Sequence, residues 1–212
     1  MTLRLDQLTV LTPNGQPLFQ PVNVSVAGGD ILSIVGASGI GKSTLLDAIG
    51  GHLKPEFRAQ GHVDLNGTDL LALPAERREV GLVFQDALLF PHLSVGDNIA
   101  FGLPSRIKGA KARRAAVNAA LGQAGLDGFY ARDPATLSGG QRARAALMRC
   151  LIAEPKAVLL DEPFSKLDPV LRIDIRDFTC AHIRAAQIPA LLVTHDLDDA
   201  TAAGGHIVEL TP

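Results

Sequence analysis

The sequence is poor in cysteine and in aromatic residues. Its 212 residues include two cysteines, one tyrosine and no tryptophan, and only 4% of the residues are aromatic. Cys150 and Cys180 form neither a disulfide framework nor a metal-binding spacing. A disulfide-stapled secreted domain and a zinc module are therefore excluded. We expect both cysteines to be small buried residues on helices.

Long apolar runs and an excess of positive charge are also missing. No apolar run approaches the ~18 residues needed to cross a bilayer, and no signal peptide opens the chain. Twenty Lys and Arg against 22 Asp and Glu give a net charge of −2. This balance provides no electrostatic basis for nucleic-acid binding, so no nucleic-acid partner is expected. We expect residues 1–212 to form one soluble cytoplasmic domain that reaches a membrane only through a partner.

Glycine is concentrated in one informative stretch. Residues 36–44 read GASGIGKST and fit the phosphate-loop pattern G-x-x-x-x-G-K-[ST]. An apolar run at 31–35 predicts a buried strand before the loop, and residues 45–49 predict a helix after it. In that setting the backbone N–H groups point at phosphate oxygens, Lys42 reaches the β- and γ-phosphates, and Ser43 is a Mg²⁺ ligand.

The alternative to a phosphate site is a flexible glycine turn before an ordinary helix. The predicted strand and helix on either side argue against that alternative. The sequence therefore predicts a nucleotide site that comprises Gly36, Ala37, Ser38, Gly39, Ile40, Gly41, Lys42, Ser43 and Thr44.

The apolar pattern predicts an α/β fold. Alternating apolar residues predict strands at 3–10 and 22–26, and a short strand at 61–65 that ends in an Asn-Gly turn. Apolar runs predict buried strands at 80–84 and 189–194 and an apolar strand at 157–162, and residues 207–210 predict a last strand. Together they predict a P-loop NTPase core with a mainly parallel sheet and an antiparallel β-layer.

The middle of the chain has a different composition. From Asp86 it is apolar and interrupted by Pro91, and residues 108–124 predict a basic, alanine-rich helix with a solvated face. A further helix is predicted from Arg142 to Glu154, stopped by Pro155. The domain is therefore expected to have a core of residues 1–85 and 155–212 and a helical subdomain at about 86–154.

Two carboxylates end the apolar run at 157–160. Asp161, at a strand end beside a phosphate loop, is a candidate Mg²⁺ ligand. The adjacent Glu162 can polarise a water for attack on a γ-phosphate. Without the phosphate loop, a solvent-exposed acidic turn would be the better interpretation. Further along, Asp168 is predicted to cap a helix that begins at Pro169 and runs to about Ala186.

The order of the motifs resembles that of the ATP-binding subunits of ABC transporters, across essentially the whole chain. Downstream of the phosphate loop come Gln85 at a strand end, Leu-Ser-Gly-Gly-Gln at 137–141, Leu-Leu-Asp-Glu at 159–162, Ser-Lys-Leu-Asp at 165–168 and His195. The motif at 137–141 is highly specific to that family. The resemblance implies an ATPase that powers transport.

The resemblance also implies residue roles. Two copies would sandwich two ATP molecules head to tail, with Mg²⁺ held by Ser43, Gln85 and Asp161. Glu162 would be the general base, His195 would contact the γ-phosphate, and Gln85 would sense Mg²⁺ and the attacking water. The nucleotide of the other copy would meet Ser138, Gly139, Gly140 and Gln141, and Asp168 would cross the interface between the copies.

Residues 89–103 are similar to those of importer subunits, which serve small solutes such as thiamine, polyamines, inorganic anions or iron. The resemblance favours import and a place on the cytoplasmic face of the inner membrane. The implied partners are integral membrane permease subunits, a second copy and, indirectly, a solute-binding protein. Apolar residues between Gln85 and Phe101 predict the permease docking surface. An exporter subunit and a non-transport ABC ATPase remain the alternatives.

Three features depart from the family pattern. No aromatic residue near Leu11 and Thr12 is available to stack on adenine, and Phe19 comes too late in the chain. Weak selectivity for the base is therefore expected. Lys166 replaces the small residue usual in the Ser-x-Leu-Asp loop. The third is that we expect residues 1–212 not to include the C-terminal regulatory domain that many importer subunits carry.

Overall fold

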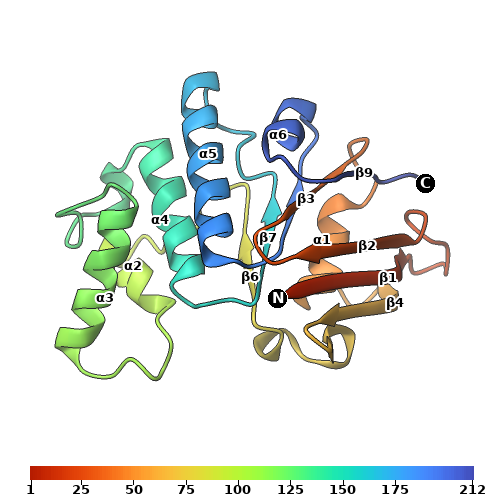
Figure 1. The fold of residues 1–212 in the computed structure, drawn as a ribbon, viewed down its shortest axis with the longest axis horizontal. Coiled ribbons are helices and arrows are strands. Elements are labelled where there is room, and N and C mark those ends of the chain that lie inside the picture. The colour runs from red at the N-terminus through yellow and green to blue at the C-terminus, as the bar shows by residue number, and fades with distance from the viewer. The chain divides into compact units, whose positions relative to one another are not determined.

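A computed structural model describes residues 1–212 and divides them into two compact units (Figure 1). The first, here called the sheet unit, comprises residues 1–82, 156–162 and 180–212. The second, the helical unit, comprises residues 83–155 and 163–179. The helices are α1 (Lys42–Gly50), α2 (Val95–Phe101), α3 (Ala110–Gln123), α4 (Gly139–Leu151), α5 (Pro169–Ala186) and α6 (Leu197–Ala202).

One sheet of the sheet unit is antiparallel, in the order β2-β1-β4-β5. Its strands are β1 (Thr2–Leu11), β2 (Val22–Ala27), β4 (Arg58–Leu65) and β5 (Thr68–Asp69). Asn66 and Gly67 connect β4 to β5, and both have positive φ, 54° and 84°. Asparagine and glycine tolerate that conformation best, as expected for the predicted turn.

The other sheet has the order β6-β7-β8-β3-β9. Its strands are β3 (Ile31–Val35), β6 (Val80–Val83), β7 (Ala157–Asp161), β8 (Ala190–Val193) and β9 (Ile207–Glu209). The strand β3 is buried along its whole length and pairs in parallel with β8 and β9, and β7 pairs in parallel with β8. The carboxyl ends of β3, β7 and β8 therefore lie at one edge of the sheet. The predicted α/β fold with a parallel sheet and an antiparallel β-layer is confirmed.

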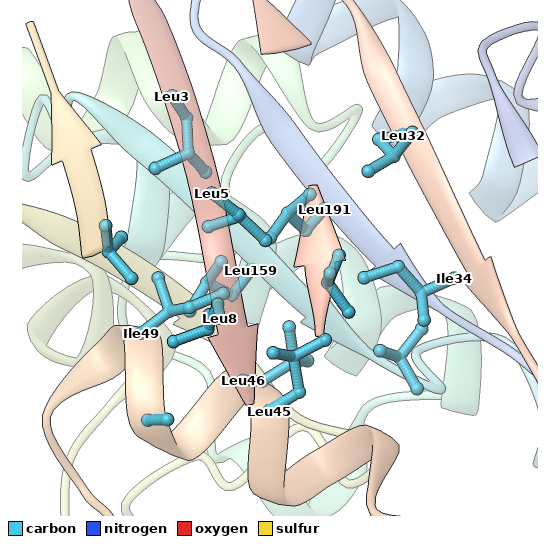
Figure 2. Close-up of a cluster of buried hydrophobic side chains, with 14 of the residues drawn as sticks. Leu3, Leu5, Leu8, Leu32, Ile34, Leu45, Leu46, Ile49, Leu159 and Leu191 are labelled. Carbon is cyan, nitrogen blue, oxygen red and sulfur yellow. The ribbon is translucent and has the colours of Figure 1, made fainter. Parts of the chain in front are cut away.

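A single apolar core joins the two sheets to α1. Figure 2 shows Leu5 and Leu8 of β1, Leu46 and Ile49 of α1, and Leu159 of β7 among the side chains that fill it. These five side chains are at most 1% exposed. Since burial of one such side chain contributes about 1.5–3 kcal/mol, this core holds the phosphate-loop helix firmly against both sheets.

A buried arginine closes the far end of α1. Arg78 is only 8% exposed and donates hydrogen bonds to the carbonyl oxygens of Ala48 (2.7 Å) and Ile49 (2.8 Å). It also donates to the carbonyl of Leu73 (2.9 Å). Burial lowers the pKa of the guanidinium, and the nearby Asp69 opposes that shift. The last carbonyls of a helix lack intrahelical partners and attract cations. Arg78 therefore provides α1 with both hydrogen-bond donors and a positive charge at its carboxyl end.

The helical unit has its own core. Apolar side chains of α2, α3 and α4 build it, among them Val95, Ile99, Val117, Leu121 and Met148.

The chain also has three short 3₁₀ helices, at Leu70–Ala72, Ala75–Arg77 and Pro134–Thr136. No helix in the structure is both long enough and apolar enough to cross a bilayer.

The helix predicted from Arg142 to Glu154 has different ends in the structure. It begins three residues earlier, at Gly139, because Ser138 caps it. It ends at Leu151, three residues before the predicted end at Glu154.

The cap of α5 is as predicted: the Asp168 carboxylate accepts a hydrogen bond from the Leu171 amide at 3.1 Å. Cys150 and Cys180 lie on α4 and α5 and are not bonded to each other; Cys180 is buried as predicted, whereas Cys150 is only half-buried. Burial raises the pKa of the Cys150 thiol to about 12.

Candidate nucleotide site

The phosphate loop connects β3 to α1 at the carboxyl edge of the parallel sheet. Gly41 is the N-cap of α1 and has a φ of 105°. A Cβ atom at this position would lie 3.1 Å from the ring of Phe19, and an L side chain rarely adopts that φ. Glycine is therefore required at Gly41 for both backbone conformation and space. The chain turns at Gly41, so that α1 begins directly after the phosphate loop.

Backbone donors in the loop are largely unused. Among the N–H groups of residues 37–45, only those of Ile40 and Leu45 donate to backbone acceptors. Lys42 is 6% exposed, and its ammonium donates to the carbonyls of Gly36 (2.9 Å) and Ala37 (3.0 Å). A concave set of N–H donors with a lysine at a helix N-terminus fits an anionic phosphate chain.

A hydroxyl and a carboxylate meet beside this loop. The Ser43 hydroxyl donates to the Asp161 carboxylate at 2.9 Å, which joins α1 to the end of β7. Burial raises the pKa of Asp161; the hydrogen bond from Ser43 opposes that shift, Glu162 adds to it and Lys42 opposes it. A cation at this point would favour the charged form of Asp161, because an opposite charge nearby favours ionisation.

The residues present fit a magnesium ion that is shared with phosphates. The chain has no group of three or more His, Cys, Asp and Glu side chains that could hold a metal on their own. Mg²⁺ in nucleotide sites usually binds one or two protein oxygens together with phosphates and water. Ser43 and Asp161 offer such a pair of oxygens next to the unused N–H donors.

Glu162 has an unusual backbone conformation. Its φ is 45°, and its amide donates to the carbonyl of Val193 in β8 at 2.9 Å. The His195 Nδ1 atom lies 3.0 Å from the Glu162 carboxylate. A non-glycine residue in the left-handed region is costly, and such residues cluster at functional sites. The structure thus brings Glu162 and His195 together at the edge of the sheet where the phosphate loop lies.

Phe19 is unavailable for stacking on a base. Its side chain is completely buried and packs beneath Gly41. Leu11 and Thr12 precede the turn at residues 13–15 and offer no aromatic ring. No aromatic side chain from residues 1–19 is therefore exposed near the loop.

The other predicted site residues belong to the helical unit. The Gln85 side-chain amide donates to the Ser165 hydroxyl at 2.9 Å. Ser138 and Gln141 form a capping box: the Gln141 amide donates to the Ser138 hydroxyl at 3.3 Å, and the Ser138 amide donates to the Gln141 side chain at 3.0 Å. Gln141 therefore has a structural contact here in addition to the role that the sequence predicts.

The two glycines of the 137–141 motif differ in the space around them. A Cβ atom at Gly140 would lie 2.4 Å from the end of the Leu171 side chain of α5, so Leu171 would have to move to admit it. A Cβ atom at Gly139 would meet nothing closer than 3.8 Å. Packing against Leu171 thus favours glycine at Gly140, whereas Gly139 has room for a side chain.

Some contacts in the helical unit had no signal in the sequence. Buried Asn98 of α2 holds the loop before it through four hydrogen bonds to the backbone of Phe90, Leu93 and Ser94. Arg149 of α4 donates to the carbonyls of Leu88 (3.0 Å) and Ala87 (3.4 Å). These polar side chains shape the apolar stretch between Gln85 and Phe101.

Known proteins resemble this chain over most of its length. A family model described as ABC transporter matches residues 19–165. The ABC transporter ATP-binding protein YnjD of Escherichia coli K12 is 48% identical over 202 residues, which is 95% of this chain and 89% of that protein. The thiamine import ATP-binding protein ThiQ of Aliivibrio fischeri is 39% identical over 184 residues, 87% of this chain and 77% of its own. The solved structure of cbiO1 from Clostridium perfringens, part of the ABC transporter complex cbiONQ, has a TM-score of 0.84 and 28% identity, and the match covers 99% of this chain and 84% of that one.

Proposed function

Because the chain belongs to the ABC transporter family, as an ATP-binding subunit that hydrolyses ATP to power transport, we propose specific roles for the residues at its site. The observation that carries the proposal is the meeting of Ser43 with Asp161 and of Glu162 with His195 at one edge of the parallel sheet. The unused N–H donors and Lys42 hold the phosphates. Ser43, Asp161 and Gln85 would supply oxygens to Mg²⁺, and the ion would neutralise charge on the phosphates.

Glu162 is the general base in this proposal. Its carboxylate accepts a proton from the attacking water, and His195 beside it orients the carboxylate and contacts the γ-phosphate. The hydrogen bond from the Glu162 amide to β8 fixes the backbone from which the carboxylate projects. A positioned carboxylate of this kind typically contributes ~10²–10⁴-fold to the rate.

The proposal includes a second copy of the chain. The donors of one copy surround the phosphates incompletely, and stabilisation of a phosphoryl-transfer transition state requires donors on all sides. Ser138, Gly139, Gly140 and Gln141 of the other copy complete the set, with Asp168 at the interface. ATP should therefore drive homodimerisation.

This assembly is tested with a variant that separates ATP binding from dimerisation. In saturating Mg-ATP, a slowly hydrolysing Glu162→Gln protein should sediment at twice its monomer mass of 22.3 kDa. Addition of Gly139→Asp should leave it monomeric, because the new carboxylate repels the γ-phosphate of the partner's nucleotide. An aspartate in the first turn of α4 favours the helix, and Gly139 has space for a Cβ atom, so the fold is retained. Dimerisation of both proteins, or of neither, would argue against the proposed assembly.

Import is the proposed direction of transport. The support is the similarity to ThiQ, whose name describes a thiamine import protein, and the importer-like stretch at residues 89–103. The partners are membrane permease subunits and, indirectly, a solute-binding protein, and the chain works at the cytoplasmic face of the inner membrane. A gene for a solute-binding protein beside a permease gene would support import, and an exporter-type permease gene alone would contradict it.

Selectivity for the base should be weak. Stacking of a base on an aromatic ring is worth roughly 1–3 kcal/mol, and Phe19 is buried beneath the phosphate loop. We expect ATP and GTP to bind within about tenfold of each other, since a difference of 1.4 kcal/mol is tenfold in affinity. Competition of each nucleotide against a fluorescent ATP analogue measures this ratio. A preference for ATP of 100-fold or more would mean that another side chain recognises adenine.

A further inference from the structure

We propose that Lys166 is a positioning residue for ATP hydrolysis: its ion pair with Asp86 holds the loop of Gln85 against the loop of Ser165 and Asp168. We call this pair the Lys166–Asp86 clamp. The inference rests on the role proposed above for Gln85 at Mg²⁺ and the attacking water. It gives a function to the one residue of the Ser-x-Leu-Asp loop that departs from the family pattern.

The clamp is one of two adjacent cross-links. The Lys166 ammonium lies 2.7 Å and 2.9 Å from the two carboxylate oxygens of Asp86. One residue earlier on each loop, the Gln85 amide donates to the Ser165 hydroxyl at 2.9 Å. A single contact leaves a loop free to pivot, whereas two consecutive contacts also fix its orientation. Residues 85 and 86 are therefore held in register with residues 165 and 166.

Packing alone does not hold these loops. Both line a cavity of about 190 Å³ in the helical unit, together with residues of α4 and α5. Its apolar lining includes Val83, Ala87, Leu147, Phe164 and Ile175. Side chains that face a cavity lack contact partners on that side, so packing restrains them less than in a filled core. The polar cross-links consequently carry more of the restraint.

The geometry orients the Gln85 amide for its proposed role. Its nitrogen is engaged by Ser165, which leaves the amide oxygen as the free end. Oxygen is the ligand type that Mg²⁺ prefers, and a water that must be activated also needs an acceptor. Loss of the clamp would free Asp86, the residue next to Gln85. The Gln85 amide oxygen would then occupy a wider range of positions.

The size of the effect follows from exposure. The side chains of Lys166 and Asp86 are 54% and 61% exposed, so the pair adds little to overall stability. It can bias the loop toward one arrangement by about fivefold, which corresponds to ~1 kcal/mol and is the upper limit usual for exposed pairs. Because solvent screens the pair, the bias should disappear at high ionic strength.

Steady-state ATP hydrolysis by the full-length protein tests the clamp. Lys166→Met should lower kcat about three- to fivefold with little change in KM, because the phosphate loop that binds ATP is unaltered. Lys166→Arg should keep the wild-type rate. The charge swap Lys166→Asp with Asp86→Lys should restore most of the rate that either single change removes.

A matched control and a salt series separate positioning from general effects. Lys156→Met breaks the Lys156–Glu79 pair, which is comparably exposed but lies at the amino end of β7, and should leave kcat unchanged. Between low salt and 1 M salt, where the Debye length is about 3 Å, the ratio of wild-type to Lys166→Met rates should fall toward one.

Two outcomes would overturn the clamp in a wild-type protein that hydrolyses ATP: an unchanged or higher kcat for Lys166→Met, or a charge swap no faster than the single variants. A wild-type protein with no ATP hydrolysis would instead contradict the proposed function.

Discussion

Glu162→Gln should lower ATP turnover about 100-fold or more while Mg-ATP still binds, because this is the scale of a lost general base. Glutamine has the shape of glutamate and can keep a hydrogen bond to His195, but it cannot accept the proton of the attacking water. The hydrogen bond from the residue-162 amide to Val193 is a backbone contact and persists in the variant. Phosphate release measures turnover, and equilibrium binding of a fluorescent ATP analogue measures affinity.

Glu79 provides a control of the same side-chain type in the same unit. It is exposed and paired with Lys156, away from the carboxyl ends of the parallel strands. Glu79→Gln should hydrolyse ATP at the wild-type rate. Normal steady-state turnover of Glu162→Gln would remove Glu162 from the mechanism, and loss of ATP binding would indicate a role in binding instead.

Phe101→Asp should uncouple the subunit from its permease. We propose residues from about Gln85 to Phe101 as the docking surface, and the structure now separates its buried and exposed members. Val95 and Ile99 are completely buried in the helical core, whereas Leu88 is 56% and Phe101 70% exposed. The exposed Phe101 ring packs on the half-buried Phe90 ring with their centroids 4.9 Å apart, and Asn98 holds the backbone of Phe90 in its loop.

A central aromatic contact in an interface is commonly worth about 2 kcal/mol or more, so permease affinity should fall about 30-fold or more. Co-purification with the permease and transport in cells both measure this loss, while ATP binding by the isolated subunit should be unchanged. Ile173→Asp alters a similarly exposed apolar residue of α5 and should leave both readouts intact. If Phe101→Asp assembled with the permease and supported normal transport, the docking surface would lie elsewhere.

Features encoded by neighbouring residues could be predicted from the sequence. The phosphate loop, the Asn66-Gly67 turn, the Asp168 cap and the buried β3 strand each depend on a few consecutive residues. Backbone preference and apolar periodicity act over such short distances, so the pattern carries the information directly. The pattern predicts the start of α4 three residues late, because a Ser-Gly-Gly run is typical of a loop and the capping box of Ser138 and Gln141 is what begins the helix at Gly139.

The sequence by itself thus determined the fold class, the order of the motifs and the family to which the chain belongs. Only the tertiary structure decided which distant residues meet: Lys166 with Asp86, Gln85 with Ser165, and Arg149 with the carbonyl of Leu88. It also decided that Phe19 is buried beneath Gly41 while Phe101 is exposed. The physical reason is that such contacts depend on how separate elements pack, whereas composition and periodicity report only the local environment of each element. Lys166 and Asp86 are 80 residues apart in the chain, and no local pattern links them.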